Sequence, residues 1–271
     1  MSDGGKAVAV SGLAYKDVAH PAAREVGKTV AGAVHLLLTP INFGIRTAQA
    51  ALDDILEKVS HRLDQDGVPA DRIQSPPTEI IAPVIRAFQY ERQDPTIRDL
   101  YLNLLATAMH TDQATSAHPA FADVIGQLSP AEAKLVPKFA SAEPRERMFP
   151  LARIVHTAGS RTWVLSPYSV DFNPFGDEMA PPVSLAAASI DNLVRVGLAR
   201  INQGQSMDDF YYRHLIQWPP LQAEMIALAS EREESAPDNQ LWQPQIERAT
   251  LSVTEFARAF ANSCTGIAPQ P

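Results

Sequence analysis

The sequence has only one cysteine, Cys264, among its 271 residues. An internal disulfide and a thiolate metal cage are therefore both excluded. A lone thiol can act as a nucleophile, but Cys264 falls at the end of a predicted C-terminal helix. Packing as a small hydrophobic residue explains it more simply, because free cysteine often behaves in that way.

Positive charge is also scarce. The formal net charge is −8, and no lysine follows Lys138. A negative chain is repelled by phosphate backbones and by anionic lipid surfaces. The charge balance therefore disfavours nucleic acid as a partner. The sequence has no positively charged leader before an apolar run at its N-terminus, so we expect a cytoplasmic protein.

The motifs of common enzymes are missing. The chain contains no Gly-x-Ser-x-Gly elbow, no Gly-x-x-x-x-Gly-Lys loop and no Gly-x-Gly-x-x-Gly loop. Two adjacent acid pairs, Asp53-Asp54 and Asp208-Asp209, do not converge on one proton, because neighbouring residues on a helix point about 100° apart. We therefore predict that the protein is not an enzyme and needs no cofactor.

A metal site is the alternative raised by three residues, His110, Asp112 and His118. Imidazole and carboxylate are suitable ligands for zinc or manganese. No further His or acid lies at a recognised spacing from them, and His118 precedes Pro119. The simpler interpretation is a His-Pro turn whose imidazole bonds nearby backbone, so we predict no metal.

One stretch, residues 29–45, carries no charge over 17 residues. A membrane-spanning helix needs about 20 mostly apolar residues, and Pro40 would interrupt this one. Two interpretations stay open: a segment packed in the core, or a segment that contacts a membrane under some conditions. The large apolar residues that would serve either role are Leu36, Leu37, Leu38, Ile41 and Phe43.

The first half of the chain is predicted to be helical. Apolar residues recur at helical spacing over 48–63, 80–88, 95–110, 119–128 and 130–141. Asp94 before Pro95 is a good N-cap, and Ser129-Pro130-Ala131-Glu132 has the pattern of a capping box. Pro83 should kink its helix or shift the start of that helix.

The second half is predicted to mix strands and helices, after a hinge at 143–150. Strands are expected at 153–156, 162–165, 198–201 and 246–251, with helices at 184–196, 219–232 and from Ser252-x-x-Glu255 to Phe260. Gly197 should end the first of these helices. The order suggests a winged-helix-like unit. The fold class is thus mainly α, with a flexible lead-in (1–20), an N-terminal helical bundle (21–148) and a small winged-helix-like α+β unit (149–271).

A group of aromatic residues lies where the wing is predicted: Phe210, Tyr211, Tyr212 and Trp218. Aromatic side chains anchor protein interfaces, so these four are candidates for binding a protein partner. They could instead fill a seam between the two halves. Binding of DNA would need basic residues here, whereas the predicted wing carries Asp208 and Asp209.

Several motifs resemble those of the abortive-infection alpha family, which comprises bacterial proteins associated with defence against bacteriophage. Four motifs carry the resemblance: His118-Pro119-x-Phe121, Leu128-Ser129-Pro130-x-Glu132-Ala133, Asn192-Leu193-x-Arg195-x-Gly197-Leu198 and Leu251-Ser252-Val253-Thr254-Glu255-Phe256-Ala257-Arg258-Ala259-Phe260. The helix end Leu104-Leu105-Ala106-x-Ala108-Met109 agrees with the family as well. The family usually has a glycine where this chain has Ala257. The family carries no established active site, so no catalytic residue is implied.

The resemblance implies a role in defence, and the residues favour a binding protein. We therefore expect a non-enzymatic, abortive-infection-like protein that acts through protein–protein recognition, with a partner that the sequence does not identify. The alternative is a membrane-acting effector that inserts helices 29–45 and 48–63 to arrest growth.

Overall fold

The computed structural model describes residues 46–89, 94–140, 147–158, 160–171, 183–233 and 243–266. The uncharged segment 29–45, with its candidate residues, lies outside the described residues. The helices of the first half are α3 (Arg46–Gln65), α4 (Thr78–Gln89), α5 (Pro95–Met109), α6 (Ala120–Gln127), α7 (Pro130–Ala133) and α8 (Val136–Phe139). The second half contains β1 (Met148–Ala158), β2 (Arg161–Val164), β3 (Ser169–Val170), α9 (Val183–Arg195), β4 (Ala199–Gln203), α10 (Asp209–Ile216), α11 (Pro219–Glu233), β5 (Pro244–Val253) and α12 (Glu255–Cys264).

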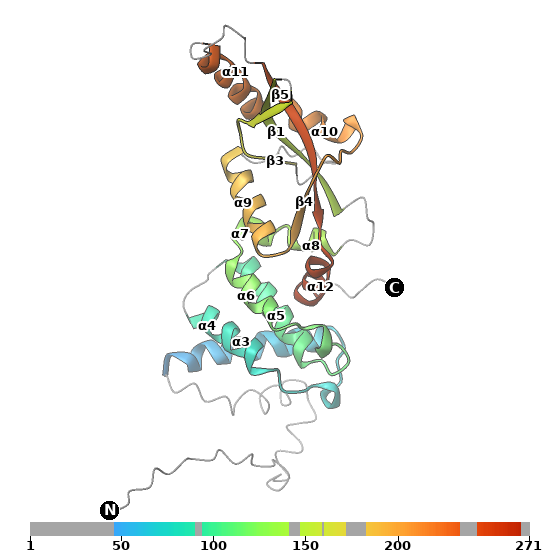
Figure 1. Ribbon diagram of the computed structural model, residues 1–271. Helices are drawn as coiled ribbons and strands as arrows, with labels where there is room; N and C mark the ends of the chain where they lie inside the picture. Colours follow the sequence, from blue (N-terminus) through green and yellow to red (C-terminus); the bar gives the residue numbers. More distant parts are fainter. Residues whose placement is uncertain are drawn as a thin grey trace, which may run out of the picture.

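The described elements stack along one long axis, with α3 and α4 at one end and α11 at the other (Figure 1). Helix α5 lies at the centre of the helical part and contacts α3, α4, α6 and α12. The side chain of Asp94 caps α5, as predicted, by accepting hydrogen bonds from the amides of Thr96 (2.9 Å) and Ile97 (3.2 Å). Leu104, Leu105 and Met109 are fully buried.

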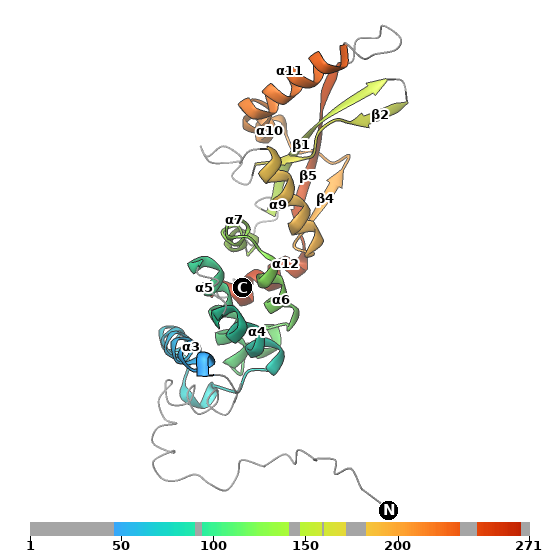
Figure 2. The same ribbon diagram turned by 90° about the vertical axis from the view of Figure 1, so that its left-hand side faces the viewer.

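Four antiparallel strands form the sheet in the order β2-β1-β5-β4, and the short β3 also pairs with β1. On one face, Ala152 and Ile154 pack with Leu215, Trp218 and Leu221 of the α10–α11 region. The neighbouring residues of β1 and β5, such as Leu151 and Leu251, point to the other face, because side chains alternate along a strand. They join the main core, which α9 helps to cover. Figure 2 shows the β1–β2 hairpin projecting to the right, away from α10 and α11.

The main core does not stop at the predicted boundary near residue 148. It runs without a break from Ile55 in α3 to Cys264 in α12. Helix α12 follows the central strand β5 and returns to pack on α5 and α8. The last helix of the chain therefore belongs to the same core as the first helices, and the division at 148/149 stays a prediction. In the part of the chain that the structure describes, no helix has both the length and the apolar character that crossing a membrane requires.

The structure corrects several predicted elements. The predicted helix 130–141 is two short helices, because Pro137 has no amide hydrogen to continue the first one. Strand β1 begins at Met148, inside the predicted hinge. The last helix is capped by Thr254, not by Ser252, which lies in β5. Helix α10 was not predicted at all.

Candidate functional site

The His-Pro turn packs against the last helix. The imidazole Nδ1 of His118 accepts a hydrogen bond from the amide of Ala120 (3.1 Å), as the sequence predicted. The ring of Phe121 follows the turn and is buried. Its centroid lies 5.3 Å from that of Phe256 and 5.4 Å from that of Phe260, both in edge-to-face geometry. Two of the four sequence motifs thus meet in one aromatic cluster.

The other two motifs meet in a hydrogen-bonded network. The Ser129 hydroxyl and the Glu132 carboxyl group form the predicted capping box at the start of α7. The same Glu132 oxygen accepts hydrogen bonds from the Ser129 amide (2.8 Å) and from Nδ2 of Asn192 in α9 (2.7 Å). Asn192 also donates to the carbonyl of Gln127 (2.9 Å). Arg195 completes the network by donating to Gln127 and Asn192 at 2.6 Å each.

Thr254 links α9 to α12. Its hydroxyl donates to the carbonyl of Gly197 (2.7 Å) and accepts from the amide of Ala257 (3.0 Å). Gly197 ends α9 with a φ of 79°, a conformation that glycine adopts without strain. Ala257 is an ordinary buried residue of the first turn of α12, so no tight backbone turn is needed there.

These contacts define what we call the motif junction. Its residues are His118, Phe121, Ser129, Glu132, Asn192, Arg195, Gly197, Thr254, Phe256 and Phe260. The junction joins the helical part to α9 and to the end of the sheet. Its hydrogen-bonding groups are directed at other protein groups, which is the arrangement expected of a structural joint.

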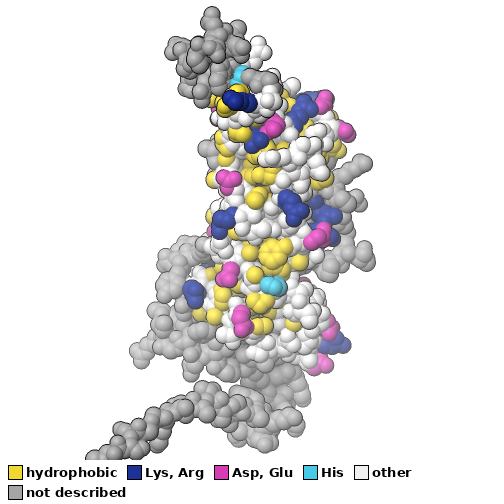
Figure 3. Space-filling model, viewed as in Figure 1, with side chains coloured by type: hydrophobic (Ala, Val, Ile, Leu, Met, Phe, Trp, Pro, Cys, Tyr) yellow, Lys and Arg dark blue, Asp and Glu magenta, His cyan; other side chains and the backbone are white. Residues whose placement is uncertain are grey.

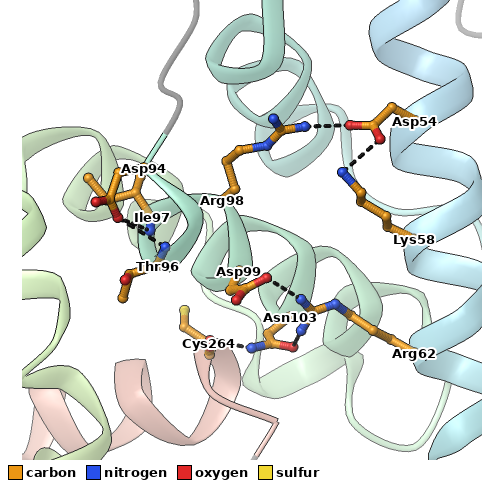
Figure 4. Close-up of polar contacts among 10 residues, drawn as sticks. All are labelled: Asp54, Lys58, Arg62, Asp94, Thr96, Ile97, Arg98, Asp99, Asn103 and Cys264. Atoms are coloured by element: carbon orange, nitrogen blue, oxygen red, sulfur yellow. Dashed lines mark hydrogen bonds and ion pairs between the residues drawn. The ribbon is translucent and has the colours of Figure 1, made fainter.

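A second polar cluster holds α3 against α5 (Figure 4). Arg98 of α5 pairs with Asp54 of α3, and Arg62 of α3 pairs with Asp99 of α5 (2.6 Å) and with Asn103. Asn103 in turn donates to the carbonyl of Cys264 in α12 (2.9 Å). Burial raises the pKa of the Cys264 thiol well above its usual value, so the thiol stays protonated and unreactive.

The residues of the metal hypothesis do not come together. Asp112 forms an ion pair with Arg72, and His118 is engaged in its turn. His110 follows α5, and its Nδ1 atom is buried without a hydrogen-bond partner. Among the described residues, no group of three or more His, Cys, Asp or Glu side chains has an arrangement that could hold a metal ion.

The four candidate aromatic residues separate into two groups. Tyr212 and Trp218 are buried beneath the sheet. The Tyr212 hydroxyl donates to the carbonyl of Ala249 (2.6 Å) and accepts from the amide of Met207 (3.2 Å). Burial raises the pKa of the Tyr212 phenol, partly offset by the Met207 amide and by Arg248. Phe210, in contrast, is 54% exposed, and Tyr211 beside it is half-buried.

Helix α10 is what separates them. Tyr212 and Leu215, three residues apart, face the sheet and are buried, while Phe210 lies on the outer side. The sequence offered one signal for this helix, an acidic residue, Asp208, at the position of an N-cap. The following Phe-Tyr-Tyr run favours a strand and obscures that signal.

The fold and the site define an α+β protein in which widely separated motifs form a structural joint. The chain belongs to the abortive infection alpha family, whose sequence model matches residues 47–264 and thus includes all four motifs. The resemblance seen in the sequence is confirmed. No curated protein and no solved structure matches the chain.

Proposed function

We propose that this member of the family is a non-enzymatic component of defence against bacteriophage and acts by binding a protein partner. Membership of the family supports an abortive-infection role. The single observation that supports recognition is the distribution of exposed apolar side chains. In the described part of the chain, all the large ones lie in the second half: Trp163, Val164, Val194, Phe210 and Ile226.

Phe210 is the best candidate for an anchor. The Tyr211 ring lies edge-to-face against it at 5.6 Å between centroids, and the Arg213 guanidinium lies 5.4 Å from its centroid. These contacts hold the exposed ring in place, so binding loses little side-chain entropy. Exposed aromatic and arginine side chains are the types that anchor protein interfaces. We call Phe210, Tyr211 and Arg213 the α10 surface.

The rim of the α10 surface carries both acidic and basic side chains. Asp208 and Asp209 are exposed next to Phe210, and Asp209 forms an ion pair with Arg248. Charged residues at the rim of an interface mainly steer the approach of a partner of opposite charge. Arg213 and Arg248 balance Asp208 and Asp209 here, so the charges around Phe210 do not favour a partner of one sign.

A protein partner suits this site better than nucleic acid. In the winged-helix-like arrangement that we propose for α9, β4 and β5, the recognition helix would be α9. The Arg195 side chain of α9 is already bonded to Gln127 and Asn192. Figure 3 shows Lys and Arg side chains interspersed with Asp and Glu over the face in view, without a continuous basic stripe.

The single thiol, which is buried, supports a cytoplasmic location.

The burial of α3 in the main core argues against the membrane-acting alternative. The apolar residues of the 48–63 segment, such as Ile55, Val59 and Leu63, are buried in the main core. Helix α3 packs on α4 and α5 and is held to α5 by the Arg98–Asp54 and Arg62–Asp99 ion pairs. Insertion into a membrane would have to remove these side chains from the core. Recognition requires no such change.

Replacing Phe210 with serine should abolish protection against phage without unfolding the protein. Loss of an aromatic anchor weakens binding by about 30-fold. The measurement is the plating efficiency of phage on cells that express each variant at equal levels. Ile226→Ser is the matched control, since Ile226 is 67% exposed on α11. Full protection by Phe210→Ser, or equal loss with Ile226→Ser, would contradict the proposed surface.

A further inference from the structure

Strand β2 forms one edge of the sheet. Among the described residues, β2 pairs with β1 alone, and all four of its residues are exposed. Two of them are large and apolar, with Trp163 38% exposed and Val164 54% exposed. The hairpin projects away from α10 and α11, so neither helix covers the outer side of β2 (Figure 2). Lysine and proline commonly protect such an edge from pairing, and β2 contains neither.

The register of the hairpin fixes which backbone groups of β2 point outward. Residues of an antiparallel pair alternate between hydrogen-bonded and non-hydrogen-bonded positions. The amide of Leu165 donates to the carbonyl of Ile154 (2.9 Å), so Leu165 occupies a hydrogen-bonded position. Trp163, two residues earlier, therefore also directs its N–H and C=O groups at β1. The N–H and C=O groups of Thr162 and Val164 point away from β1. We call this outer side of the strand the β2 edge.

The β2 edge matches itself under a two-fold rotation. When two copies place their β2 strands antiparallel with Trp163 opposite Trp163, Thr162 of one copy lies opposite Val164 of the other. Each such pair exchanges both N–H to C=O hydrogen bonds, because both residues direct these groups outward. A rotation centred on Thr162 or on Val164 would place only one such pair within the strands. The register centred on Trp163 thus uses the whole edge.

The side chains suit this register. Trp163 of each copy would take a non-hydrogen-bonded position, where opposed side chains are closest and aromatic pairs are favourable. The Trp163 ring lies against the His156 ring of β1, at 5.5 Å between centroids, which holds it on one face of the sheet. Arg161 is the one charged residue of β2. The two copies of Arg161 would lie at opposite ends of the paired strands, about 13 Å apart, which exceeds the Debye length of about 8 Å.

We propose that the β2 edge pairs with the β2 edge of a second copy of this chain, so that the two sheets join across a two-fold axis. The register favours a second copy over an unrelated strand, because it fits itself and brings no like charges together. The paired strands are short, so we expect a weak dimer with a dissociation constant in the micromolar range. The β2 edge is separate from the α10 surface, and its pairing does not depend on the proposed function.

Sedimentation velocity of the full chain between about 1 and 500 µM tests the proposal. We expect the average mass to rise toward that of two chains as the concentration rises. Val164→Pro should weaken association by about 30-fold, because each copy loses an outward N–H donor while the bonds between β1 and β2 are kept. Val164→Thr keeps that donor and is the matched control. The mass of one chain at every concentration, or equal association of the two variants, would overturn the proposal.

Disulfide formation locates the two-fold axis. The native thiol of Cys264 is fully buried and stays protonated, so an added cysteine is the reactive one. Trp163→Cys should give a disulfide-linked dimer under mild oxidation at high concentration. Opposed residues at this position lie about 4.5 Å apart between Cα atoms, within reach of a disulfide. Val164→Cys should not, because its two copies lie diagonally, about 8 Å apart. Equal linkage at both positions, or none at 163, would contradict the register.

Discussion

Phe121→Ala should lower the free energy of unfolding by about 3–5 kcal/mol, the range for removing a buried phenylalanine side chain. Phe121 is 2% exposed, and its ring contacts the rings of Phe256 and Phe260 in α12. Removing it leaves a cavity between the His-Pro turn and the last helix. Urea unfolding followed by circular dichroism measures the effect as a lower midpoint.

The matched control is Phe210→Ala. The same side chain is removed there, but from an exposed position, so we expect a change of about 0.5 kcal/mol or less. The comparison separates the two roles assigned to aromatic residues in this protein. Similar stabilities for Phe121→Ala and the unsubstituted chain would show that the aromatic cluster does not hold α12 in place.

Glu132→Ala should lower the free energy of unfolding by about 2–3 kcal/mol. The Glu132 carboxyl group is buried and accepts hydrogen bonds from the Ser129 amide and from Asn192. Alanine removes that acceptor and leaves both donors with fewer partners. The effect combines a lost helix cap with a lost connection between α7 and α9. Urea unfolding again provides the measurement.

Glu132→Gln provides the control for this network. Glutamine keeps an acceptor oxygen and is accepted in a capping box, so it should retain a large part of the stability that alanine loses. Asp123→Ala removes an exposed acid nearby and should change stability by about 0.5 kcal/mol or less. If glutamine and alanine were equally destabilising, the hydrogen bonds of Glu132 would not be the cause.

Local signals predicted local structure well. The Asp94 cap, the Ser129–Glu132 capping box and the glycine end of α9 each depend on residues within a few positions of one another. Local signals gave the wrong secondary structure where helix and strand signals occurred in the same segment. The Phe-Tyr-Tyr run of α10 favours a strand by propensity, but the burial of Tyr212 and Leu215 against the sheet stabilises a helix.

The candidate site could be predicted only in part, because its contacts are distant in sequence. The motifs could be identified in the sequence. Nothing in the sequence indicated that Asn192 donates a hydrogen bond to Glu132, which lies 60 residues earlier. The separation of the four candidate aromatic residues into buried and exposed ones could not be predicted for the same reason. Phe210 and Tyr212 are two residues apart, and only the position of α10 on the sheet decides that one is exposed and the other buried.

The protein thus separates two tasks. The motif junction holds the helices and the sheet together, and we propose that the exposed α10 surface binds the partner. Glu132 and Phe121 should affect defence only through stability. Phe210 should affect defence with little change in stability, because its side chain is exposed whereas those of Glu132 and Phe121 are buried.

The most direct test is photo-crosslinking in cells during phage challenge, with p-benzoylphenylalanine at position 210. We predict one discrete adduct of higher mass that contains a second protein. The same group at position 226, which is also exposed, should not form it. The absence of an adduct at 210, or the same adducts at both positions, would contradict recognition through the α10 surface.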